Sequence, residues 1–521
     1  MKATDELFQL IQSLSKTEKG YFKKYSSLYA PDKERVYLKL FDAIARQKEY
    51  DEESLKKHFR EEAFIQYFSV AKNYLYNLIL KSLRSYHTEN DVDVIIGNML
   101  RDVKLLHGKA LYAPCAKLLT KAKQLAKEHE RELALLTIYR LQYELNLSHY
   151  SQEKQRRISA EDYNEQKQQL RQYTEFIEYQ KLMNDILFLG VKQSDKTRSK
   201  EQADQRDRIM EHPLLSRDEG EIGYRTRNMF YNIWGLYFYQ KSEFEKARAI
   251  LLQNLRFLEA NKHRLSEESI SYTGTLINLI NTALNMEDFD LAHELLDKFN
   301  ELGKESIHLQ IKAFQITALS EIFIAEATGE LEHALASVPG IERKLLLYKG
   351  KINIINEVII YFNISSLYFV AGEFSKSLAW RNKMFDNCDV EVKEDILCAS
   401  KIMNLINQYE LGNADVLEFM LRSTYRYLYK KARIYKHEKL ILEFIRKLCN
   451  ITTKEGLNQI FTRLRDQLLT LQQEPYEKSP FYFDIISWLE SKIYHVTMQQ
   501  IVKAKAKAAL EQPLQILDKQ E

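Results

Sequence analysis

Histidines, cysteines and acidic residues are the side chains most able to catalyse a reaction or hold a metal, but their spacing in this chain suits neither task. His293-Glu294 is followed by Leu295, Leu296 and Asp297, so the zinc-binding pattern H-E-x-x-H lacks its second histidine. His129-Glu130 lacks it as well. The sequence therefore predicts no metal site.

Glycine-rich phosphate-binding loops are missing too. Gly350-Lys351 would close a G-x-x-x-x-G-K loop, but Leu345 stands where the first glycine belongs. No G-x-G-x-x-G and no nucleophile elbow occurs. The acid pair Asp288 and Asp290 fits the start of a helix, where the helix dipole favours negative charge. We therefore expect no enzymatic activity and no cofactor.

The strongest local charge lies in residues 421–450, which hold nine Lys and Arg against two Glu. At helical spacing, an apolar stripe through Leu421 and Leu428 is flanked by a basic one. We name this second set the basic stripe, and its members are Arg422, Arg426, Lys430, Arg433 and His437. It could bind phosphate, an acidic peptide or RNA, or it could be solvated surface whose long side chains cover apolar neighbours.

Asparagines recur along the predicted first helices of the repeats described below, and four of them are candidate binding residues: Asn278, Asn281, Asn363 and Asn404. Their amides could clamp the backbone of a bound peptide. They could equally hydrogen-bond one helix to the next. Both readings remain open at this point.

The composition indicates which kind of secondary structure positions these candidate residues. The chain has 521 residues but only 15 Gly and 7 Pro, too few for the turns of a large sheet protein. The net charge of +3 gives no overall nucleic-acid or membrane signature. The four cysteines form no C-x-x-C pair and no disulfide framework. We expect helices with short links, in a reducing compartment.

A short motif recurs along the second half of the chain. Each copy has a small or polar residue, an acidic or amide residue, an apolar residue and, three positions later, Ala, Ser or Leu. The five copies are 242–247, 287–292, 329–334, 372–377 and 412–417, spaced by 45, 42, 43 and 40 residues. Near-constant spacing in this range predicts stacked helical hairpins.

These copies resemble the turn of the tetratricopeptide repeat, most closely at Gly329-Glu330-Leu331 and Gly372-Glu373-Phe374. Gly235 falls at that family's small-residue position, and Asn278 and Asn363 at its Asn position. The period of about 43 departs from the family's 34, and its terminal proline is missing. The chain also resembles long helical proteins of bacteria. The resemblance implies an all-α, right-handed superhelical solenoid of hairpins with helical N-terminal and C-terminal caps.

The predicted organisation has five parts. They are an N-terminal helical cap (1–90), early hairpins (91–192), a charged linker or loop (193–212), tetratricopeptide-like repeats (213–425), and a basic helix with C-terminal capping helices (426–521). Ser15 and Glu18 have capping-box spacing in the first part. The basic stretch 503–510 is expected to be helical and to fray.

These features favour a non-enzymatic scaffold or adaptor that binds a peptide or helix in a concave groove. The alternative is a nucleic-acid or ribonucleoprotein binder, or a peptide-sensing transcription regulator, using the basic stripe or the N-terminal cap. No apolar run is long enough to span a membrane, and no signal peptide is visible at the start. We therefore expect a protein partner, no membrane association and a cytoplasmic location.

Overall fold

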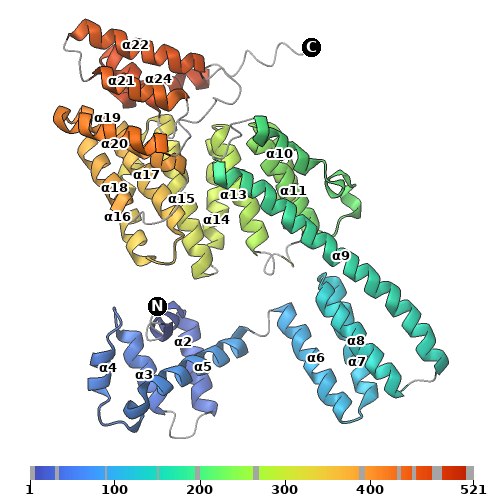
Figure 1. The fold of residues 1–521 in the computed structure, drawn as a ribbon. Helices are drawn as coiled ribbons and strands as arrows, with labels where there is room; N and C mark the ends of the chain where they lie inside the picture. The colour runs from blue at the N-terminus through green and yellow to red at the C-terminus, as the bar shows by residue number, and fades with distance from the viewer. Residues whose placement is uncertain are drawn as a thin grey trace. The chain divides into compact units, whose positions relative to one another are not determined.

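The computed structural model describes residues 6–29, 35–87, 91–149, 152–193, 200–261, 264, 269–304, 306–386, 394–430, 436–448, 453–471 and 484–511. Over these residues the chain forms helices and no strand (Figure 1), which confirms the all-α prediction. It divides into two compact units, residues 1–174 and 175–521.

The first unit begins with a small helical bundle. Its helices are α1 (Glu6–Ser13), α2 (Lys16–Tyr29), α3 (Arg35–Arg46), α4 (Glu52–His58), the 3-10 turn η2 (Ala63–Tyr67) and α5 (Phe68–His87). Ile11, Leu40 and Ile44 are fully buried at its centre. The capping box forms as predicted, because the Ser15 amide donates to Glu18 Oε2 and the Glu18 amide to Ser15 Oγ.

Further along, successive helices pack on one another: α6 (Val92–Gly108), α7 (Tyr112–Glu128) and α8 (Glu132–His149). Helix α9 (Gln152–Gln193) is continuous across the division between the units. The second unit then opens with α10 (Lys200–Met210) and the 3-10 turns η3 (Pro213–Ser216) and η4 (Glu219–Glu221). Helix α10 thus covers much of the predicted linker, while residues 194–199 lie outside the described residues.

The rest of the second unit is a series of helices in which each packs on the next. They are α11 (Tyr224–Gln240), α12 (Phe244–Ala260), α13 (Ser269–Asn285), α14 (Phe289–Leu302), α15 (Ile307–Thr328), α16 (Leu331–Leu347), α17 (Ile354–Val370), α18 (Phe374–Asp386), α19 (Glu394–Glu410), α20 (Ala414–Lys430), α21 (Lys436–Leu448), α22 (Lys454–Leu471), α23 (Ile485–Tyr494) and α24 (Met498–Glu511).

All five copies of the sequence motif lie at helix-to-helix turns with the same backbone geometry. The first residue of each copy has a positive φ: 60° at Ser242, 58° at Glu287, 73° at Gly329, 77° at Gly372 and 73° at Gly412. The residue two positions later begins the next helix in every copy. In four copies the amide of the second residue donates to a carbonyl five residues earlier, which closes the helix end.

The residue that ends each motif, small in four copies and leucine in the fifth, is buried. Ala247, Ala292, Ala334, Ser377 and Leu417 are all at most 2 % exposed. A need for close approach explains Gly235. A Cβ built at Gly235 would lie 2.5 Å from Leu251 Cδ2, so α11 and α12 can approach this closely only with glycine there.

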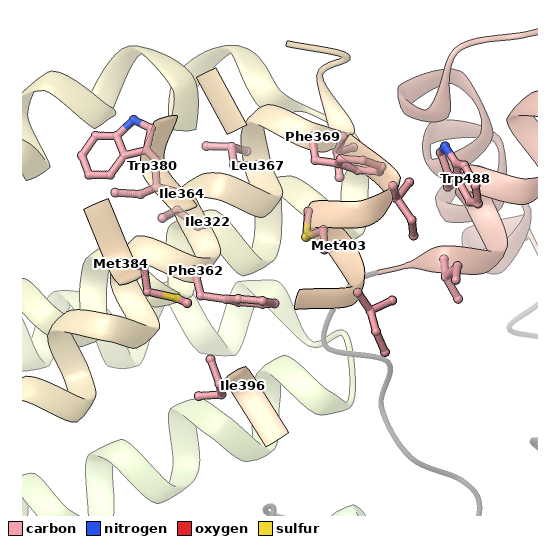
Figure 2. Packing of buried hydrophobic residues seen from close by; sticks show 14 of the residues in the cluster. Ile322, Phe362, Ile364, Leu367, Phe369, Trp380, Met384, Ile396, Met403 and Trp488 are labelled. Carbon is pink, nitrogen blue, oxygen red and sulfur yellow. The ribbon is translucent and has the colours of Figure 1, made fainter. Parts of the chain in front are cut away.

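The C-terminal helices fold back onto an earlier hairpin. One hydrophobic core runs from α15 to α24 and includes Phe362, Met403 and Trp488 (Figure 2). Gln499 Nε2 donates to the carbonyl oxygen of Gly329, at 2.9 Å, and Lys505 pairs with Glu490 at 2.8 Å. The stretch 503–510 lies in α24, which confirms that it is helical, and α24 packs on α15.

Candidate interaction groove

Asn278 is one of the repeated asparagines that form a hydrogen bond between neighbouring helices. Its Nδ2 donates to Oδ1 of Asn232 at 2.9 Å, which links α13 to α11. Asn285 donates to Tyr239 of α11, and Asn356 of α17 donates to Gln315 of α15. The bonded pairs are 46, 46 and 41 residues apart, close to the motif spacing. The amides therefore connect the first helices of successive hairpins.

The other three candidate asparagines occupy different environments. Asn281 is exposed on α13, and Asn363 is half-buried on α17. Asn404 is 9 % exposed on α19, and its Oδ1 is a buried acceptor without a hydrogen-bond donor. The four candidate asparagines thus differ in how far they are exposed.

The basic stripe is divided between two helices. Arg422 and Arg426 are exposed on α20, where Arg422 pairs with Glu418 at 2.6 Å. Lys430 is the last residue of α20, and Arg433 lies outside the described residues. His437 lies on α21 with its side chain only 9 % exposed. His437 therefore does not share the exposed surface of Arg422 and Arg426.

A buried arginine that the sequence pattern did not single out joins three helices. Arg381 of α18 is 1 % exposed, and it donates to the carbonyl oxygen of Ser400 at 3.0 Å and to Ser365 Oγ at 2.8 Å. Both acceptors are neutral, and burial lowers the pKa of Arg381 to about 9. The guanidinium still carries its charge at neutral pH. Its role here is to tie α17, α18 and α19 together.

A hollow lined by several helices lies between α14, α15 and α16. It has a volume of about 710 Å³, and we call it the α15 groove. Its floor is the α15 face that carries Gln310, Phe314, Thr317 and Glu321, spaced three or four residues apart. A hollow of about 940 Å³ beside α22 is larger, but its lining is one face of that helix with Leu440, so it has a single wall.

One wall of the α15 groove, helix α16, has a proline well beyond its first turn. Pro339 in α16 has no amide hydrogen, so the carbonyl of Leu335 loses its helical donor. Three of the α16 residues that line the groove are small, Ala336, Ser337 and Gly340, and they lie among the larger His333, Ile341, Arg343 and Lys344. A Cβ at Gly340 would meet only Arg343 Nη2, at 4.0 Å. The small side chains leave this wall open.

The floor of the groove is apolar and aromatic around Phe314. Phe314 and Tyr348 are 7 % and 5 % exposed, and their ring centroids lie 5.7 Å apart. Lys344 Nζ lies over the Phe314 ring, 5.3 Å from its centroid. Opposite, Thr317 Oγ1 donates to Asn300 Oδ1 at 3.0 Å and joins α15 to the α14 wall.

Charge is unevenly distributed along the groove. Lys304, Arg343 and Lys344 lie at the end where α15 begins, and Lys304 also pairs with Glu301 at 2.6 Å. Glu321 lies 11 residues beyond Gln310 on α15, with His293 Nε2 at 3.9 Å from its carboxylate. The groove therefore has a basic end, an aromatic middle and an acidic end.

The sequence reasoning missed this groove, because it looked to the first helices of the hairpins. The walls come instead from the second helices, α14 and α16, on either side of α15. The one local signal was Pro339-Gly340 inside an otherwise helical stretch.

Over the described part of the chain, no three His, Cys, Asp or Glu side chains gather in a way that could hold a metal ion. No described helix is both long and apolar enough to cross a membrane. No protein-family model, curated protein or solved structure matches the chain, so its function has to be argued from its own residues.

Proposed function

We propose that this protein is a non-enzymatic interaction scaffold that binds a short segment of another protein in the α15 groove. The observation that carries the proposal is the groove itself: three helices enclose about 710 Å³ around a partly apolar floor. Grooves between packed helices with apolar floors suit amphipathic peptide segments.

The architecture we propose is a right-handed solenoid of tetratricopeptide-like hairpins, running from α11 to α20. Two features support it. Five turns share one backbone geometry, and side-chain amides form hydrogen bonds between helices that are about one motif spacing apart in the sequence. Each hairpin buries only part of its apolar surface, so it is completed by its neighbours. Such a stack provides a rigid support for a binding groove. We place the protein in the cytoplasm, in keeping with the buried thiols of Cys115 and Cys398.

The test is selection of a phage-displayed library of random 12-residue peptides on the full chain. Gly340→Leu should abolish capture, because its side chain enters open groove space rather than the protein interior. Gly97→Leu is the matched control, since Gly97 lies on α6 and also has no neighbour within 4 Å of a built Cβ. The proposal fails if no peptide is enriched, or if the enriched peptides bind the Gly340→Leu variant as tightly as the parent.

The nucleic-acid alternative has weaker support. Only Arg422 and Arg426 of the basic stripe are seen exposed, and Arg422 already pairs with Glu418. Changing both arginines to glutamate should leave peptide capture unchanged. Binding of a single-stranded RNA probe that falls steeply with salt and disappears in this double variant would favour the alternative instead.

A further inference from the structure

The lining of the α15 groove indicates which kind of segment would bind there. This inference rests on the proposed function. We infer that its ligand is a short apolar protein segment with carboxylates at one end, and that this acidic end lies against Lys304, Arg343 and Lys344.

The length of the groove limits the segment. The lining residues of α15 run from Gln310 to Glu321, and 11 helical steps of 1.5 Å give roughly 16 Å. An extended chain advances about 3.3 Å per residue, so this distance takes about five extended residues or three turns of helix. The ligand is therefore a short linear segment rather than a folded domain.

The middle of the groove selects apolar side chains. Ala313, Phe314 and Ala318 form the floor, and Ala336 and Gly340 leave space above them. An aliphatic or aromatic side chain placed there removes apolar surface from water on both partners, worth about 25 cal/mol per Å².

The basic end selects carboxylates. Three cationic side chains line this end. Among the described contacts, Lys304 forms an ion pair with Glu301. Lys344 rests on the Phe314 ring, which holds its ammonium beside the apolar floor. A carboxylate next to an apolar side chain would therefore meet a cation next to an aromatic ring. Glu321 at the opposite end repels a second acidic group, which makes the preference one-sided.

The charge preference is tested by repeating the 12-residue library selection on charge-reversed variants. The parent should enrich peptides that carry Asp or Glu at one end of an apolar core. Arg343→Glu combined with Lys344→Glu should weaken those peptides by at least about tenfold, and its own selection should enrich Lys and Arg instead. Glu321→Lys should enrich peptides with acidic residues at both ends.

Controls separate this inference from the proposed function. The double variant Arg422→Glu, Arg426→Glu removes the same charge from exposed α20 and should bind the parent's peptides unchanged. Helical circular dichroism and the melting temperature verify that each variant is folded. If Gly340→Leu blocks capture but the charge reversals leave the selected sequences unchanged, the charge inference is wrong and the scaffold proposal stands. If no peptide is captured at all, both are wrong.

Discussion

At the scale of single residues, the same substitution by alanine is expected to have opposite effects on stability at two glycines. A Cβ at Gly235 would lie 2.5 and 2.7 Å from two atoms of Leu251, which is 1 % exposed. A Cβ at Gly340 meets one flexible arginine atom at 4.0 Å. Gly235 is required by close helix packing, whereas Gly340 is required only by the open groove.

Gly235→Ala should therefore lower the free energy of unfolding by about 1–3 kcal/mol, because the core around Leu251 must shift. Gly340→Ala should raise it by up to about 1 kcal/mol, because alanine is the better helix former. Thermal unfolding followed by circular dichroism measures both. Equal melting temperatures for the two variants would contradict the packing described for α11 and α12.

A buried carboxylate makes stability depend on pH. Glu326 of α15 has its Oε1 buried without a hydrogen-bond donor. Burial raises the pKa of Glu326 to about 8, the nearby Asp484 adds to the rise, and a hydrogen bond from Ser366 opposes it. The folded state therefore holds a proton that the unfolded chain, with a pKa of 4.5, has released at neutral pH.

The contribution of Glu326 to stability should thus be largest below about pH 4.5 and should be lost as the pH rises toward 8, with a slope of at most about 1.4 kcal/mol per pH unit. Glu326→Gln keeps the shape but cannot titrate. Melting temperatures measured from pH 5 to 8 should fall less steeply in this variant than in the parent. Parallel curves would show that Glu326 ionises normally.

At the scale of elements, the same turn is built from different residues. Gly329, Gly372 and Gly412 take the positive φ without strain, whereas Ser242 and Glu287 take it with a side chain. The sequence motif therefore marks the turn, but its first residue is not always the best one for the backbone it must adopt.

Ser242→Gly should stabilise the protein by about 1 kcal/mol, and Gly372→Ala should destabilise it by about 1–2 kcal/mol, because a left-handed residue with a Cβ is strained. Melting temperatures of the two single variants test this. A stabilising Gly372→Ala would mean that the turn at 372 lacks the positive φ on which the shared geometry depends.

At the scale of the whole molecule, the buried residues form separate clusters. Ile44 belongs to the core of the N-terminal bundle, and Ile364 belongs to the core that runs from α15 to α24. Both side chains are 0 % exposed. In repeat proteins each element is stabilised mainly by its neighbours, so the effects of a cavity should be local.

Ile44→Ala should accelerate amide hydrogen exchange within residues 6–87 and leave α15–α24 unchanged, and Ile364→Ala should do the reverse. Each cavity is expected to cost about 2–5 kcal/mol locally. Exchange followed by mass spectrometry on peptides from both regions makes the comparison. Faster exchange in both regions of either variant would show that the two cores unfold together.

The sequence alone was sufficient for local features. Few glycines and prolines indicated helices, Ser15 and Glu18 predicted a capping box, and the motif at 242–417 predicted five equivalent turns. These features depend on residues a few positions apart, whose backbone preferences and hydrogen bonds are largely independent of distant parts of the chain.

Only the tertiary structure could show which helix faces are covered. It buried His437, joined Asn278 to Asn232, placed α24 on α15 and left the α15 groove open between α14 and α16. Each outcome depends on the angle and distance at which non-adjacent helices pack. Those quantities follow from the summed fit of many side chains, which no single stretch of sequence contains.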